Sequence, residues 1–199
     1  MLLYDSPVSG NCYKVRLLFG QLGIEYERHE VDVVDRSNRR ELLGDLNPAL
    51  RVPTLVLDDG RPVAESNAIL WYFGEDTRFV PEDRYERAQV LQWLFWEQYE
   101  HEPAIAVARF LKDWSPNPQA YKERREELTA KGEHVLATME RHLEGREWFV
   151  GDAMTLADIA LYAYTHVADE GGFSLSRRSA IEAWLERVAA QPGHVPIEA

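Results

Sequence analysis

In the first part of the chain, apolar residues occur in turn at the spacing typical of strands and at the spacing typical of helices. Residues 1–4 form a short apolar run, as in a buried strand, and residues 11–22 then place apolar side chains at helical spacing. Residues 26–34 alternate valines with charged residues, as a half-buried strand does. Residues 36–48 are polar and predict a weak helix or a loop. The order to this point is therefore strand, helix, strand, helix.

A hairpin and another helix complete this first pattern. Residues 54–66 contain an apolar run, an Asp-Asp-Gly turn and a second short strand, which is typical of a β-hairpin. Ser66 is predicted to cap a following helix that carries three apolar residues at helical spacing. The resulting β-α-β-α-β-β-α order favours a small mixed sheet flanked by helices.

Strand signals stop after this point, and only helical patterns follow. Helices are predicted over residues 85–111, 118–143 and 179–193, and one more begins at Thr155. Asp158 stands three residues after Thr155, as in a capping box. The predicted organisation is an α/β domain over residues 1–76, a linker over 77–84 and an all-helical domain over 85–199.

Composition and charge narrow the classes of function. The chain of 199 residues has a formal net charge of −12, which argues against nucleic acid or an anionic membrane surface as the partner. Its single cysteine excludes an intramolecular disulfide, and the scattered histidines show no metal-ligand spacing. No basic-then-apolar leader opens the chain, and no apolar run approaches about 18 residues. We therefore expect a cytoplasmic protein without a structural metal.

The first candidate functional residues lie between the first predicted strand and the first predicted helix. Ser9, Gly10, Asn11 and Cys12 bring together backbone N–H donors, a hydroxyl, an amide and the positive end of a helix dipole. Such a place stabilises an anion, and a thiolate bound there would have its pKa lowered. The same residues also suit an ordinary helix N-cap. The loop by itself leaves both interpretations open.

Two further segments fit a peptide ligand. Pro53 stands where a strand begins and cannot donate to the sheet, so the backbone of Val52 could pair with an extended peptide, although an edge-strand proline is the simpler interpretation. Glu65 could bind an amine, and the Ser66 hydroxyl with nearby N–H groups could bind a carboxylate. An anion site, a strand edge and an amino-acid clamp together describe a site for a tripeptide thiol.

These landmarks resemble those of the cytosolic glutathione transferases, in order and nearly from end to end. The resemblance rests on the Ser9 loop and on three segments, NPALRVPTL (47–55), ESNAIL (65–70) and MTLADIAL (154–161). It implies a thioredoxin-like N-terminal domain, an all-helical C-terminal domain and a homodimer. Ser9 falls where the serine-type classes keep their catalytic hydroxyl. Asn11 falls where the bacterial nu-like group uses an asparagine, and that group has threonine at the position of Ser9.

The resemblance also assigns a glutathione subsite to each segment. It implies that Arg51 and Val52 contact the glycyl and cysteinyl parts of glutathione, with Val52 pairing through its backbone before a cis Pro53. Glu65 and Ser66 would hold the γ-glutamyl end.

The chain departs from some classes of this family. Tyrosine-type classes have a hydroxyl residue that is not matched here, because Tyr4 ends the strand. Cysteine-type relatives place their reactive cysteine nearer Ser9 than Cys12 lies, so Cys12 is expected to be an inert residue of the helix. Asp158, by resemblance, is a folding element of the helical domain.

The site for an acceptor is expected in the helical domain. Within residues 96–110, Tyr99, Arg109 and Phe110 could form an aromatic wall with a cation for an electrophile. The alternative, equally open, is that these residues belong to the core, a dimer face or surface ion pairs.

The sequence thus favours a glutathione transferase active in detoxification. Glutathione is the expected co-substrate, and its thiolate would attack a small electrophilic carbon without a metal. One alternative is a glutathione-dependent disulfide reductase, as in the nu-like group, which would use two glutathiones. Another is a non-catalytic module that binds glutathione or another ligand.

Overall fold

The computed structural model describes the backbone of residues 1–199 and every side chain except that of Pro118. Contacts divide the chain into two compact units, residues 1–77 with 191–199, and residues 78–190. The final segment, which the sequence pattern grouped with the helices, thus makes its contacts within the first unit. No described helix is both long and apolar enough to cross a membrane.

The first unit is built on a four-stranded sheet in the order β2-β1-β3-β4. Strands β1 and β2 are parallel, and the other two pairs are antiparallel. Its elements are β1 (Leu2–Asp5), α1 (Gly10–Leu22), β2 (Glu27–Glu30), α2 (Arg39–Leu43), β3 (Thr54–Val56), β4 (Pro62–Ala64) and α3 (Ser66–Gly74). This order confirms the predicted mixed sheet with its hairpin and helices.

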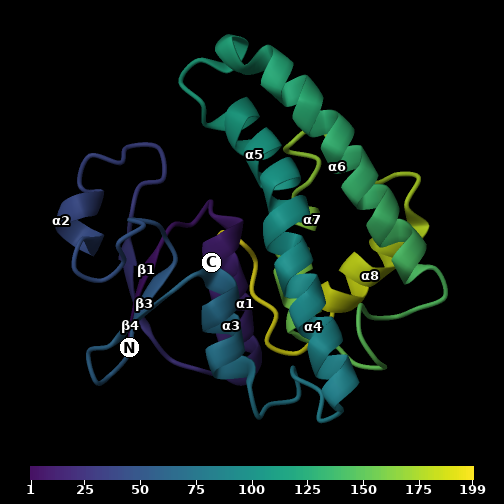
Figure 1. Cartoon of the computed structure of the whole chain (residues 1–199), viewed down its shortest axis with the longest axis horizontal. Helices are drawn as coiled ribbons and strands as arrows, with labels where there is room; N and C mark the ends of the chain where they lie inside the picture. The colour runs from purple at the N-terminus through teal and green to yellow at the C-terminus, as the bar shows by residue number, and fades with distance from the viewer. The chain divides into compact units, whose positions relative to one another are not determined.

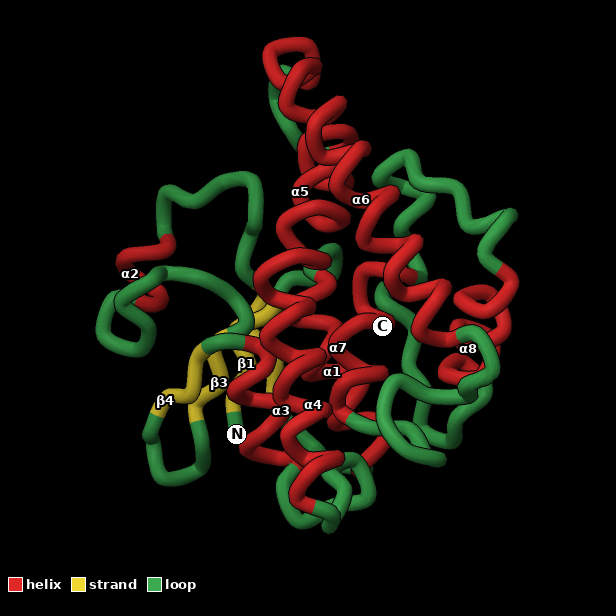
Figure 2. The backbone as a smooth tube through the Cα atoms, turned by 45° about the vertical axis from the view of Figure 1, so that its right-hand side comes forward, coloured by secondary structure: helices red, strands yellow, loops and turns green.

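Helices α1 and α3 cover one face of this sheet. The core between them joins side chains from β1, β3 and both helices, each of them fully buried: Leu3, Val15, Phe19, Leu55 and Ile69. Helix α2 lies on the side of the sheet away from α1 and α3 (Figures 1 and 2). The apolar spacing that predicted α1 therefore marks the face that packs on the sheet.

Strand β2 is shorter and more exposed than its pattern suggested. Only Glu27–Glu30 pair with β1, all four residues are exposed, and β2 is an edge strand. Val31 follows the strand and is buried to 1% exposure. The alternating valines therefore mark the end of the strand and not its interior, and a half-buried strand over 26–34 is corrected to a short polar edge.

The second unit is all helical, as predicted. Its elements are α4 (Arg84–Trp96), the π-helical turn η1 (Glu97–His101), α5 (Glu102–Asp113), the 3-10 turn η2 (Pro118–Tyr121), α6 (Lys122–Leu143), α7 (Leu156–Thr165) and α8 (Ser179–Ala189). The single helix expected over residues 85–111 is thus α4 and α5 joined through η1. The sequence pattern did not show the wider π turn.

The predicted capping box at the start of α7 is present. Thr155 is the N-cap, and its backbone N–H donates to Asp158 Oδ2 at 2.8 Å. Asp158 Oδ1 also accepts from the Phe149 N–H at 3.1 Å and from Trp184 Nε1 at 2.9 Å. Asp158 therefore connects the start of α7 with α8. Its complete burial raises the pKa of the carboxyl to about 6, against the lowering effect of these donors.

Candidate functional site

Three segments singled out in the sequence meet the sheet at the same end of its strands. Tyr4, near the end of β1, is the partner of Thr54, the first residue of β3. Thr54 is in turn the partner of Ala64, the last residue of β4. The loop after β1, the segment before β3 and the residues after β4 therefore meet at this end of the strands, which we call the Ser9 edge.

Ser9 stands at the Ser9 edge as the N-cap of α1. Its backbone is extended, and its Oγ accepts a hydrogen bond from the Cys12 N–H at 3.3 Å. That bond occupies a lone pair of the oxygen, so the hydroxyl hydrogen can donate to another acceptor. Ser9 therefore caps the helix and could also donate to a bound anion, and the two interpretations of this loop are compatible.

Asn11 is joined to the start of α3 by a triangle of hydrogen bonds. Lys14 Nζ donates to Asn11 Oδ1 at 2.8 Å and to Ser66 Oγ at 3.3 Å. Ser66 Oγ donates to Asn11 Oδ1 at 3.2 Å. The first turn of α1 is thus connected to the predicted γ-glutamyl clamp. Lys14 was missed in the sequence, because its contact with Ser66 joins two helices that are far apart along the chain.

Ser66 does not cap α3, so that prediction is wrong. Ser66 is the first residue of the helix, and Glu65 occupies the N-cap position without a side-chain cap hydrogen bond. The Ser66 hydroxyl is directed to Asn11 instead. Glu65 has φ 69°, which is strained for a residue with a side chain and is a feature that collects at functional sites. Its side chain is exposed at the Ser9 edge.

The segment before β3 is held by two side chains. Asn47 Nδ2 and Thr54 Oγ1 donate to the Arg51 carbonyl at 3.0 and 2.8 Å. The Val52–Pro53 peptide bond is cis, as the resemblance implied. Val52 lies outside the sheet ladder, which begins at Thr54. The backbone of Val52 is therefore placed beside the sheet and not within it, where an extended ligand could pair with it.

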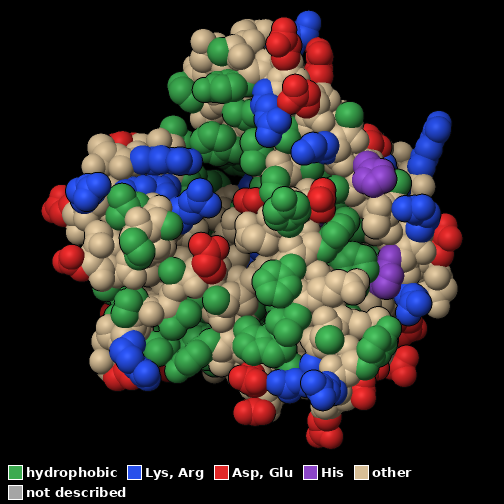
Figure 3. All heavy atoms as spheres, in the orientation of Figure 1, with side chains coloured by type: hydrophobic (Ala, Val, Ile, Leu, Met, Phe, Trp, Pro, Cys, Tyr) green, Lys and Arg blue, Asp and Glu red, His purple; other side chains and the backbone are tan. Residues whose placement is uncertain are grey.

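Arginine side chains gather around α2 despite the acidic chain. Figure 3 shows Lys and Arg side chains clustered over the α2 region of the first unit. Arg36, Arg40 and Arg51 are exposed, whereas Arg39 is buried and donates to the Leu50 carbonyl at 3.0 Å. This local positive charge favours an anionic ligand near the segment that carries Arg51.

Cys12 cannot supply a reactive thiolate in this structure. Its side chain is fully buried on α1. Burial, with a smaller contribution from the Asp5 carboxylate, raises the pKa of the Cys12 thiol to about 12. The sulfur chemistry of this fold would therefore come from a bound thiol.

The residues considered for an acceptor are in different environments. Tyr99 is 81% exposed on η1. Arg109 is buried on α5, where its Nε donates to Glu170 Oε2 at 2.6 Å and its guanidinium lies 4.4 Å from the centre of the Trp114 ring. Phe110 is half-buried. The charge of Arg109 is thus balanced by Glu170, and an acceptor site at these residues stays a prediction.

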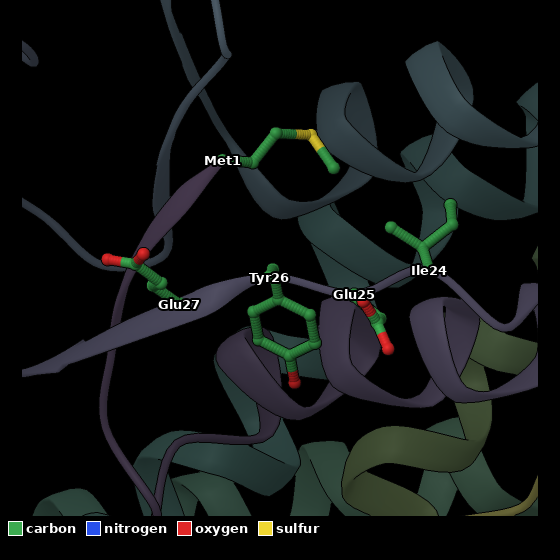
Figure 4. Close-up of a pocket in the computed structure, with 5 residues that line it drawn as sticks. All are labelled: Met1, Ile24, Glu25, Tyr26 and Glu27. Carbon is green, nitrogen blue, oxygen red and sulfur yellow. The ribbon is translucent and has the colours of Figure 1, made fainter.

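A pocket of about 610 Å³ lies at the other end of the strands, where β1 and β2 begin. It is lined by Met1, Ile24, Glu25, Tyr26 and Glu27 (Figure 4). Leu2 pairs with Glu27 and Val56, at the other end of β1 and β3 from the Tyr4–Thr54 pair. This pocket is therefore not part of the Ser9 edge. Among the residues that the structure describes, no group of three or more His, Cys, Asp or Glu side chains could hold a metal ion.

Comparison with known protein families identifies the class to which a protein with this fold and this Ser9 edge belongs. Residues 8–76 match the glutathione S-transferase N-terminal domain, and residues 95–192 match the glutathione S-transferase C-terminal domain. The chain belongs to the glutathione S-transferase family.

Individual relatives cover almost the whole chain. The crystal structure of a glutathione S-transferase from Pseudomonas fluorescens Pf-5 is 44% identical, with a TM-score of 0.96, over 100% of this chain and 98% of that one. The disulfide-bond oxidoreductase YfcG of Escherichia coli K12 is 29% identical over 96% of this chain and 90% of its own length. A glutathione transferase from Burkholderia graminis, solved with two glutathione molecules bound per subunit, is 25% identical, with a TM-score of 0.81, over 96% of this chain and 84% of that one.

Proposed function

We propose that this protein is a glutathione transferase that binds the tripeptide at the Ser9 edge and activates its thiol. Ser9 and Asn11 donate hydrogen bonds to the thiolate, which attacks a small electrophilic carbon. The observation that carries the proposal is the hydrogen bond between Ser66 and Asn11, because it connects the proposed thiol site with the proposed γ-glutamyl site. Membership of the family and the glutathione-bound relative support it.

The remaining ligand contacts follow from the same edge. Arg51 contributes charge for the glycyl carboxylate, and the backbone of Val52, before Pro53, pairs with the cysteinyl residue. Glu65 binds the α-amino group of the γ-glutamyl residue, and Ser66 binds its carboxylate through the backbone N–H, because its hydroxyl hydrogen is donated to Asn11. Arg109 with Tyr99 and Phe110 remains the proposed acceptor side, and no metal takes part.

The test measures glutathione binding by calorimetry and turnover with an activated chloroarene. Ser9→Gly removes the hydroxyl while costing the helix cap only a few tenths of a kcal/mol, whereas Ser9→Thr keeps both. We expect Ser9→Gly to lower kcat/KM at least tenfold and Ser9→Thr to retain most of it. Ser37→Ala, an exposed serine of the same unit, is the control and should not change the rate. Absence of glutathione binding at millimolar concentration would contradict the proposal.

A second candidate function is glutathione-dependent disulfide reduction. It is favoured by the similarity to YfcG and by the inaccessible thiol of Cys12, since the two electrons would come from two glutathiones. One glutathione thiolate attacks the disulfide and expels a thiolate. A second glutathione then attacks the mixed disulfide, so that glutathione disulfide and two acceptor thiols are produced. Fast turnover of a small disulfide with slow turnover of the chloroarene would favour this function.

We also propose that the protein is a cytoplasmic homodimer. The second unit exposes three large aromatic side chains on α4 and η1, at 70% for Tyr85, 71% for Phe95 and 81% for Tyr99, and such a group is typical of an interface. Light scattering after size-exclusion chromatography should give twice the chain mass of 23.0 kDa.

A non-catalytic binding module would bind glutathione but show neither turnover nor a lowered thiol pKa.

A further inference from the structure

Lys14 is a fully buried cation whose charge the proposed function does not use. It lies on α1, two residues beyond Cys12, with 0% of its side chain exposed. Its ammonium donates to Asn11 and to Ser66, one residue from each of the two proposed glutathione subsites. The buried ammonium therefore joins the two proposed subsites through hydrogen bonds that only a donor can make.

The ammonium determines which way the Asn11 side chain faces. An ammonium has three donors and no acceptor, so only the oxygen of a carboxamide can point to it. Asn11 must therefore turn Oδ1 toward Lys14, 2.8 Å away, and Nδ2 toward the opposite side. A flipped carboxamide would set two donors against each other. The orientation follows from the chemistry of Lys14 and does not depend on what else Asn11 contacts.

Ser66 cannot fix this orientation alone. A hydroxyl both donates and accepts, so it could pair with either end of the Asn11 carboxamide. The bond of 3.3 Å from Lys14 to Ser66 Oγ uses the oxygen as acceptor and leaves its hydrogen for Asn11. Lys14 thus orients both partners in the triangle.

We propose that Lys14 is a positioning residue, which holds the amide nitrogen of Asn11 toward the sulfur of a bound glutathione. This inference rests on the proposed function, because it concerns how Asn11 donates to the thiolate. Lys14 itself does not contact the sulfur. It acts through Asn11, and it therefore has no effect of its own on the thiol once Asn11 is removed.

The central experiment compares the thiol pKa of bound glutathione in the wild type and in Lys14→Met, from the ultraviolet absorbance of the thiolate. Methionine has a similar length, and replacing a buried charge by an apolar side chain is often neutral or stabilising. We expect the pKa to rise by about one unit, which is a tenfold loss of thiolate below the pKa. The pH profile of kcat/KM should move by the same amount. Lys14→Arg, also a donor without an acceptor, should restore the wild-type value.

A matched control lies beside Lys14 on the same helix. Tyr13 is also fully buried, and its hydroxyl donates to the Val195 carbonyl at 2.8 Å. Tyr13→Phe removes this partly buried hydrogen bond without touching the triangle. It should lower the melting temperature and leave the thiol pKa unchanged. Lys14→Met should raise the thiol pKa without lowering the melting temperature.

The double variant tests whether Lys14 acts through Asn11. In an Asn11→Ala background, Lys14→Met should cause no further rise in the thiol pKa. An equal rise in both backgrounds would mean that the cation acts directly on the sulfur, and it would overturn the inference. An unchanged pKa in folded Lys14→Met would overturn it as well.

A measurement without glutathione separates this inference from the proposed function. The side-chain amide of Asn11 should give one sharp pair of ¹⁵N–¹H signals in the wild type, assigned by their loss in Asn11→Ala. Lys14→Met should shift and broaden them as the carboxamide samples both orientations. Unchanged signals would overturn the positioning role. Failure of the wild type to bind glutathione, with changed signals in the variant, would contradict the proposed function and the link to the thiol but not the orientation.

Discussion

The buried carboxyl of Asp158 gives a prediction with two parts, a loss of stability when its hydrogen bonds are removed and a pH dependence that follows from its burial. Asp158→Ala leaves three fixed buried donors without an acceptor: the N–H groups of Phe149 and Thr155, and Trp184 Nε1. Each costs about 1–3 kcal/mol, so we expect the free energy of unfolding at neutral pH to fall by at least about 3 kcal/mol. The exposed Asp152 lies on the loop before α7, and Asp152→Ala should change stability by less than about 0.5 kcal/mol.

The pH dependence of this effect tests its electrostatic part. The pKa of Asp158 is raised from 3.8 to about 6 in the folded protein. The folded state therefore binds the proton more tightly, and the resulting stability is complete below the unfolded pKa and is lost as pH rises through about 6. A shift of this size corresponds to about 3 kcal/mol, of which about 1.4 kcal/mol falls between pH 5 and 7.5.

Urea unfolding of the wild type and of Asp158→Ala at several pH values between 5 and 7.5 measures this directly. The stability difference between the two proteins should be larger at pH 5 than at pH 7.5 by about 1.4 kcal/mol. A difference that grows with pH would refute the reasoning, because the hydrogen bonds would then outweigh burial and lower the pKa of the carboxyl.

Three further changes test other parts of the structure. Cys12→Ala should retain activity, and wild-type Cys12 should not react with a thiol reagent at pH 8 in the folded protein, since burial raises its pKa to about 12; fast labelling would contradict this. Gly132→Ala would place a Cβ in steric conflict with the Phe173 ring, so we expect a loss of about 1–3 kcal/mol in urea unfolding, and an unchanged midpoint would show that the ring can move. Asp5→Asn should lower the melting temperature, because it weakens the buried ion pair with Arg16 at 2.6 Å, and a higher melting temperature would indicate that this pair is not stabilising.

The sequence predicts the parts of the fold that depend on local pattern. The apolar spacing of α1, the turn around Gly60 and the capping box of Asp158 are each determined by residues within a few positions of one another. The position of β2 was less clear, because this strand has no buried face. Its four residues are all exposed, and nothing in their alternation marks them.

The candidate site could be predicted only in part, for a similar reason. Ser9 and Asn11 are visible as a loop before a helix, but their connection to Ser66 spans 55 residues and depends on the sheet register. The same register places Ser66 inside the first turn of α3 and not at its cap. Lys14 carries no local signal for its partners, since its contact with Ser66 joins two helices.

The final segment of the first unit has a consequence for how the chain is made. Arg16 donates to the Ile197 carbonyl at 2.6 Å, and Tyr13 donates to Val195 at 2.8 Å, so buried groups of α1 depend on residues 195–197. These partners leave the ribosome only after the entire helical unit has been synthesised. The thioredoxin-like unit therefore cannot be finished in the order of translation: α1 must wait, with an arginine and a tyrosine still hydrated, while 113 residues of the other unit, 78–190, emerge. A chain that ends at residue 190 would contain the entire helical unit but an incomplete sheet unit, although the sheet was synthesised first.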